Sequence, residues 1–327
     1  MSAAASILDV ADLWVAFPSY REATIYALKG LDLRIAPGEM IGLVGESGSG
    51  KTTLARAIMG LVPPPGVIER GQVAFAGLDL RAMDEETRRG LLGRDIAMVI
   101  PNPRAELNPV LTVGQQIANI ALHHLGVGRK EAMAVALDML RAVRIPDPER
   151  RLHAYPHELS GGMAQRVVIA IALACSPKLV ISDDATSGLD VTVQAQVLDL
   201  LQSMVRQKGA ATLFITRDIA ITAHFCSRIG IIYDGQIVEM ADTRAFFARP
   251  AHPYSIMLLA AFSHNPALRA RWTRGDVAIA GQRAGAGCAF APRCVRRQPR
   301  CLAEAPELRT LGFGHQTRCH FPVQAPA

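Results

Sequence analysis

The chain has 327 residues, half of them hydrophobic, and a formal net charge of +6 at pH 7. This length predicts about two domains, and the apolar fraction excludes a disordered chain. The longest apolar runs are too short to cross a bilayer, and the first residues lack the segments of a signal peptide. We therefore expect a cytoplasmic protein with reduced thiols, whose mild positive charge is compatible with an anionic surface without requiring one.

The first elements predict a small sheet that leads into a buried strand. Residues 7–17 alternate well enough for an edge strand, and residues 26–35 favour a second strand. The apolar run at 40–44 then predicts a buried strand. Among the aromatic residues before this strand, Phe17 is our candidate for stacking on an adenine ring; Tyr20, Tyr26 and simple core packing are the alternatives.

A glycine-rich turn follows this strand and precedes a predicted helix. It comprises Gly45, Glu46, Ser47, Gly48, Ser49, Gly50, Lys51, Thr52 and Thr53. Between a strand and a helix, this pattern predicts a phosphate-binding loop rather than a plain connection. Backbone N–H groups and the helix N-terminus would surround a polyphosphate. Lys51 should reach its β- and γ-phosphates, and Thr52 should bind Mg²⁺.

The middle of the chain alternates between strands and helices. Two short strands are predicted within 71–80 and a buried strand at 96–100, which the prolines from Pro101 onward bring to an end. The apolar period becomes helical at 112–144. Ser160, Gly161 and Gly162 then precede another helix, where Ser160 suits the N-cap and the glycines can expose backbone N–H groups.

Two carboxylates end the next predicted strand. Because a strand-end aspartate after a phosphate loop is where Mg²⁺ is held, Asp183 is the second predicted magnesium ligand, and Asp184 follows it directly. Asp190 ends a turn before an amphipathic helix at 191–207. A strand at 211–216 runs into Arg217, and residues 229–240 predict a hairpin.

The last part of the chain is rich in cysteine. From residue 266 the periodicity fades, and Cys288, Cys294, Cys301 and Cys319 follow. In a reduced compartment, clustered cysteines are more often metal ligands than disulfides. The absence of a CxxC pair weakens a zinc-ribbon interpretation, although zinc with His320 in place of one thiolate stays possible.

The order of these motifs resembles the ATP-binding subunit of ABC transporters over about residues 7–262. The shared parts are the phosphate loop, a signature of the type LSGGQ, a strand-end carboxylate pair and a D-loop. Further features resemble the oligopeptide, dipeptide and nickel importer branch, namely Asn108-Pro109, the signature form Leu-Ser-Gly-Gly-Met, His252-Pro253-Tyr254 and the cysteine-bearing tail.

The resemblance implies an α/β fold, a P-loop NTPase of ABC type with a mixed-sheet RecA-like core, an antiparallel β subdomain and a helical insertion at about 104–172. It divides the chain into an ABC-type domain at 1–262 and a small, irregular, Cys-rich extension at 263–327. Because this extension carries a [4Fe-4S] cluster in some relatives, the resemblance favours iron–sulfur ligation by the four cysteines, with zinc or unligated thiols as alternatives.

The resemblance also implies partners. In the family, two ATPase subunits hold ATP between the phosphate loop of one and the signature of the other. Ser160, Gly161, Gly162 and Asp190 would therefore serve the partner's nucleotide. We expect two transmembrane permease subunits, an extracytoplasmic solute-binding protein that acts indirectly, and no nucleic acid. The chain would lie peripherally on the cytoplasmic face of the inner membrane and support solute import, with peptides as the expected solute.

Three catalytic positions depart from the family pattern. Pro101 stands at the glutamine-loop position, where its ring offers neither donor nor acceptor. Arg217 replaces the switch histidine and cannot accept a hydrogen bond. Asp184 replaces a glutamate general base and is one methylene shorter, which predicts a weak base.

Together these departures predict a site that binds MgATP and hydrolyses it poorly. The chain would then pair with a different ATPase subunit and complete that subunit's active site with its signature. The alternatives are a regulator that uses nucleotide as a switch, and a soluble ABC-type ATPase acting on nucleic acid or ribosomes.

Overall fold

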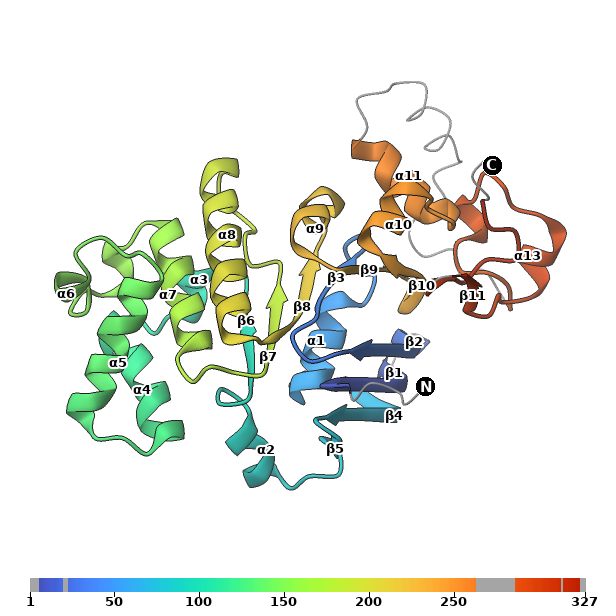
Figure 1. Ribbon diagram of the computed structural model, residues 1–327. Coiled ribbons are helices and arrows are strands. Elements are labelled where there is room, and N and C mark those ends of the chain that lie inside the picture. The colour runs from blue at the N-terminus through green and yellow to red at the C-terminus, as the bar shows by residue number, and fades with distance from the viewer. Residues whose placement is uncertain (1–5, 20–22, 263–285, 313, 324–327) are drawn as a thin grey trace.

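The computed structural model describes residues 6–19, 23–262, 286–312 and 314–323 (Figure 1). Its strands form two sheets. A four-stranded sheet has the order β2-β1-β4-β5, and an eight-stranded sheet has the order β11-β12-β10-β9-β3-β8-β7-β6. The predicted α/β fold, with a mixed core sheet and a separate antiparallel subdomain, is confirmed.

The antiparallel sheet covers one side of the first helix. Its strands are β1 (Leu8–Phe17), β2 (Ile25–Ile35), β4 (Val67–Phe75) and β5 (Leu78–Asp79). Leu8 pairs with Ile35 on one side and with Phe75 on the other. Alternate side chains of β1 are buried against α1 (Lys51–Met59), whose Leu54 and Ile58 belong to the same apolar cluster. This shared core joins the subdomain to the main sheet, because a half-buried strand turns alternate side chains inward.

The centre of the larger sheet is parallel. It comprises β3 (Met40–Val44), β6 (Ile96–Val99), β7 (Leu179–Asp183), β8 (Ala211–Thr216) and β9 (Arg228–Tyr233). Every residue of β7 and β8 is buried, in keeping with the mostly apolar sequences of these two strands. Because parallel strands end at the same edge, the segments that follow β3, β7 and β8 meet there. β10 (Gln236–Asp242) pairs antiparallel to β9.

A group of helices lies beside the end of the sheet that β6 forms (Figure 1). It contains α3 (Pro103–Glu106), α4 (Val113–Leu125), α5 (Arg129–Ala142), α6 (Pro148–Arg151), η1 (Pro156–Glu158) and α7 (Gly161–Leu173). The side chains that the helical period placed on the apolar face, such as Ile117, Ala121 and Leu140, are buried in one cluster. Thr112 and Gln115 form a capping box at the start of α4. The helical insertion is thus confirmed.

The remaining helices connect or cover the strands. They are α2 (Glu85–Leu91), α8 (Val191–Lys208), α9 (Ile219–Phe225), α10 (Thr243–Ala248) and α11 (Pro253–Phe262). Across the described ranges, no helix combines the length and apolar character that crossing a bilayer requires.

The cysteine-bearing segment is built onto the core sheet. It contains η2 (Ala291–Arg293), α13 (Pro299–Ala303), β11 (Arg309–Gly312) and β12 (His315–Thr317), and β12 pairs with β10. The buried carboxylate of Glu239 accepts hydrogen bonds from the N–H groups of Ala251 and His252 at 2.7 and 2.8 Å, and lies 2.7 Å from Nε2 of His315. The predicted boundary at 262/263 borders residues outside the described ranges and stays a prediction.

Candidate nucleotide site

The phosphate loop turns tightly between β3 and α1. Gly48 and Gly50 have φ angles of +79° and +107°, in the left-handed region that favours glycine. A Cβ atom at Gly45 would lie 2.3 Å from the carbonyl oxygen of Ile232, and one at Gly50 would lie 2.6 Å from that of Ala27. Glycine is therefore required here by backbone conformation and by close approach of neighbouring chain.

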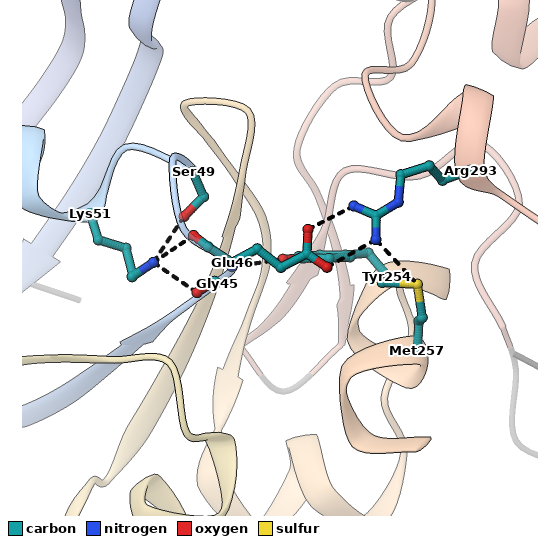
Figure 2. Close-up of polar contacts among 7 residues, drawn as sticks. All are labelled: Gly45, Glu46, Ser49, Lys51, Tyr254, Met257 and Arg293. Carbon is teal, nitrogen blue, oxygen red and sulfur yellow. Dashed lines mark hydrogen bonds and ion pairs between the residues drawn. The ribbon is translucent and has the colours of Figure 1, made fainter. Parts of the chain in front are cut away.

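Lys51 occupies the interior of this loop and is only 8% exposed. Its ammonium donates hydrogen bonds to the carbonyl oxygens of Gly45 and Glu46, both at 2.7 Å, and to Oγ of Ser49 at 3.2 Å (Figure 2). Burial lowers the pKa of Lys51 to about 8, although the nearby carboxylates oppose this shift. The ammonium of Lys51 therefore already lies inside the loop. A bound phosphate would replace its present uncharged partners, which are two carbonyl oxygens and one hydroxyl.

Thr52 and Asp183 meet at the edge of the core sheet, where the Thr52 hydroxyl hydrogen-bonds the Asp183 carboxylate; their role as magnesium ligands stays a prediction. The pKa of Asp183 is raised mainly by burial, while a hydrogen bond from the Thr52 hydroxyl opposes the shift. Both side chains line one open pocket, together with Ala27, Ser47, Gly48, Gly50, Lys51, Thr53, Asp184 and Arg217. A hydroxyl beside a carboxylate supplies the hard oxygen ligands that Mg²⁺ prefers. These residues therefore fit a magnesium ion.

Asp184 is held by an ion pair. Arg217 approaches its Oδ2 atom with Nη2 at 2.9 Å and Nε at 3.1 Å, and Nη2 also lies 3.4 Å from Oγ of Ser187. Asp184 itself has a positive φ of 46°. The carboxylate at the expected position of the general base is thus paired with a permanent cation. Pro101 is partly buried in the segment after β6 and is absent from the described residues that line the pocket.

The signature serine and the aspartate of the D-loop lie at the starts of two helices. Ser160 is the N-cap of α7 and accepts a hydrogen bond from the N–H of Met163 at 3.3 Å. Asp190 caps α8 in the same way, through Val193 at 3.0 Å. Within the described chain, neither of them lines the pocket around Lys51. Their expected action on a partner's nucleotide stays a prediction, as does that of Gly161 and Gly162.

Of the aromatic candidates for the adenine ring, Phe17 and Tyr26 lie outside the lining of this pocket. Phe17 ends β1 and is partly buried, and a Cβ atom at Gly66 would lie 2.6 Å from its ring. Tyr26 packs edge-to-face on Trp14 with ring centroids 5.7 Å apart. Tyr20 is not among the described residues. The assignment of Phe17 to the adenine ring stays a prediction.

Sequence reasoning missed the contacts that support the loop from behind. The N–H of Glu46 donates to the hydroxyl of Tyr254 at 3.0 Å. The Glu46 carboxylate receives two hydrogen bonds from the guanidinium of Arg293, at 2.7 and 2.9 Å (Figure 2). These partners lie 208 and 247 residues further along the chain. The motif His252-Pro253-Tyr254 marked this part of the chain in the sequence. It did not indicate that Tyr254 contacts the phosphate loop.

The four cysteines of the tail line one small cavity, together with His320 and other side chains. Burial raises the pKa values of Cys288, Cys294 and Cys319, the last to about 11. Yet in the part of the chain that is described, no group of three or more His, Cys, Asp or Glu residues is placed to hold a metal ion. The expected iron–sulfur or zinc site is therefore not supported by this arrangement. His320 instead places Nε2 2.9 Å from the carbonyl oxygen of Glu304.

Comparisons with known proteins agree with this geometry. The family model of ABC transporters matches residues 28–187, and that of the oligopeptide/dipeptide transporter C-terminal region matches residues 238–301. The chain is 40% identical to the dipeptide transport ATP-binding protein DppD of Escherichia coli K12, over 97% of each chain. It is 42% identical to the probable peptide ABC transporter ATP-binding protein y4tR of Sinorhizobium fredii, over 96% of this chain and 94% of that one.

A solved structure shows the same likeness at the level of the fold. The ATP-binding cassette MJ0796, in a dimeric post-hydrolysis state bound to ADP and Pi, superposes with a TM-score of 0.65 and 26% identity. The match covers 72% of this chain and 99% of that cassette. The chain therefore belongs to the ATP-binding proteins of the ABC transporters, in their oligopeptide/dipeptide branch.

Proposed function

We propose that this chain is an ATP-binding subunit of a peptide importer. The observation that carries the proposal is the meeting of Lys51, Thr52 and Asp183 in one pocket, within a chain that is 40% identical to a dipeptide transport ATP-binding protein over nearly its whole length. In this role it would bind MgATP and drive two transmembrane permease subunits from the inner face of the membrane. The solute itself would be selected by those subunits and by an external binding protein.

We further propose that the chain's own pocket binds ATP and hydrolyses it slowly. The ion pair between Asp184 and Arg217 supports this, because it occupies the carboxylate that would receive the proton of the attacking water. Arg217 has no free acceptor atom with which to relay a proton. Pro101 can bind neither the metal nor water through its side chain. The chain thus retains the groups that hold the triphosphate and lacks a competent base.

A slow site favours an unequal dimer. Two copies of this chain would carry two slow sites, whereas a different ATPase subunit would supply one efficient site. Ser160, at the start of α7, would then complete the partner's pocket from across the interface. The helix start and the free N–H groups of Gly161 and Gly162 suit contact with a γ-phosphate.

We also propose a [4Fe-4S] cluster for the tail. The proposal rests on the four thiols that line one cavity, because such a cluster is held by four thiolates. In the described chain these thiols do not form a metal-binding group, so cluster binding would have to draw them together. When bound, the cluster would cross-link and so stabilise a segment that has little hydrophobic core of its own. We expect iron and acid-labile sulfide in equal amounts, with broad visible absorption. Substitution of Cys294 by Ser should remove both, and substitution of Cys175, outside the cavity, should remove neither.

The test of the main proposal is purification of the tagged chain from its own cells. Co-purification of two membrane subunits and a second ATPase is the expected result. ATP turnover should be present in the complex and nearly absent in the isolated chain. Rapid turnover by the isolated chain, abolished by Lys51→Ala, would contradict the slow site. Recovery of nucleic acid or ribosomes instead of membrane subunits would contradict the importer.

A further inference from the structure

The phosphate loop is tied to the cysteine-bearing segment through one ion pair. In Figure 2, the Glu46 side chain extends away from Lys51 and meets the guanidinium of Arg293. Nη1 lies 2.7 Å from Oε2 and Nη2 lies 2.9 Å from Oε1, so the contact is bidentate. This fork geometry is the strongest arrangement available to an arginine and a carboxylate.

Arg293 is itself held in place by its surroundings. It belongs to η2, directly before Cys294, and its guanidinium carbon lies 5.8 Å from the ring centre of Tyr233 and 5.9 Å from that of Phe290. Nη2 also lies 3.9 Å from the sulfur of Met257. The guanidinium is thus flanked by a ring of β9 in the core sheet, a ring of the cysteine-bearing segment and a sulfur of α11.

The same loop segment holds the lysine that binds phosphate. The carbonyl oxygen of Glu46 accepts a hydrogen bond from Lys51 at 2.7 Å, and the N–H of Glu46 donates to Tyr254 at 3.0 Å. Displacement of Glu46 would therefore also displace the partner of the Lys51 ammonium. A free carboxylate at this position would in addition repel a triphosphate, because like charges at short range raise the energy of the complex.

We infer that Arg293 is a positioning residue for nucleotide binding: it neutralises Glu46 and holds it on the outer side of the phosphate loop, so that the cysteine-bearing segment sets the loop's affinity for ATP. The inference rests on the proposed ATP-binding function. It predicts that loss of Arg293 harms binding mainly through the charge that it leaves behind on Glu46. Removal of that charge should then restore binding.

A double-mutant cycle tests this, with the Kd of the full-length chain for a fluorescent ATP analogue as readout. Arg293→Ala should weaken binding about tenfold at low salt, and this loss should shrink at high ionic strength as the repulsion is screened. Glu46→Gln alone supplies the remaining corner of the cycle; it removes the charge and keeps a hydrogen-bond acceptor for Arg293, so it should weaken binding less than Arg293→Ala does. The double variant Glu46→Gln with Arg293→Ala should recover most of the loss. Arg297→Ala, an exposed arginine in the same segment, is the matched control and should leave Kd unchanged.

The outcomes separate this inference from the proposed function. If the unmodified chain does not bind the analogue, or Lys51→Ala binds it equally well, the proposed function fails. If the unmodified chain binds and Arg293→Ala binds just as tightly, the positioning role is overturned. If the double variant is as weak as Arg293→Ala, the loss comes from a disturbed segment rather than from the Glu46 charge, which also overturns the inference.

Discussion

The two sides of the nucleotide pocket differ in what they retain. The binding side presents Lys51, Thr52 and Asp183, with a buried ammonium and a hydroxyl bonded to a carboxylate. The cleavage side presents Asp184 in an ion pair with Arg217. Binding a polyphosphate needs only fixed charges and N–H groups, whereas cleavage needs a group that accepts a proton at the right moment. The slow site that we propose follows from this contrast: the pocket would keep the groups for binding and lack those for cleavage.

Restoring the family's residues at the three departing positions should have the largest effect on ATP turnover. A variant with Asp184→Glu, Arg217→His and Pro101→Gln should raise ATP turnover by roughly 100-fold, since a positioned general base contributes about 10²–10⁴-fold. The Kd for ATP should change little, because the binding side is untouched. Turnover at this pocket would be measured by phosphate release at saturating MgATP, in a complex whose partner ATPase carries a substitution that inactivates its own efficient pocket.

The matched control for this repair is the same variant with Lys51→Ala added. It should show no gain over the unmodified chain. If the repaired chain is as slow as its parent while binding ATP normally, the three positions do not explain the slow site.

Removal of the Lys51 side chain should strongly weaken nucleotide binding. Lys51→Ala should weaken ATP binding by roughly 100-fold, because it deletes a buried charge that pairs with phosphate, and charge-assisted contacts are the strong ones. Titration with the fluorescent analogue measures this directly. Arg56→Ala, on the exposed face of α1, serves as a control that leaves the loop intact. Comparable Kd values for the lysine and control variants would disprove the role of Lys51.

Binding should also depend on pH through Lys51. Burial lowers its pKa to about 8 in the empty pocket, so the ammonium form is nearly complete at about pH 7, about half populated at pH 8 and declines further above it. A bound phosphate stabilises the charged ammonium form of Lys51 over the neutral amine, and so raises the pKa of Lys51. Affinity should therefore change little from about pH 6.5 to 7 and fall as pH rises through 8, by up to about fivefold between pH 8 and 9.

Calorimetry in two buffers with different ionisation enthalpies checks this proton uptake. The expected signature is proton uptake on binding at pH 8.5 and almost none at pH 7. Affinity that rises above pH 8 would contradict a depressed lysine.

The sequence predicted the binding side because its signals are local. The strand, the glycines, Lys51 and the following helix lie within a short stretch, and backbone physics restricts what such a stretch can form. The parallel strands also brought Asp183 and Arg217 to one edge, as strand order requires. That Arg217 pairs with Asp184 is a property of side-chain packing, which the pattern alone does not specify.

The contacts that hold the phosphate loop from the C-terminal part of the chain could not be predicted from local signals. Arg293 and Glu46 are separated by 247 residues, and nothing near either residue indicates the other. The pairing of β12 with β10 is similar, because a three-residue strand has too little alternation to predict a partner. Contacts of this kind depend on the whole fold being in place.

The most direct measurement is the identity of the nucleotide in each pocket of the assembled transporter during turnover. Rapid freezing under saturating MgATP, followed by electron microscopy, would resolve both. The account predicts intact ATP beside Lys51 and ADP in the pocket that Ser160 helps to close. ADP beside Lys51 as often as in the opposite pocket would contradict it.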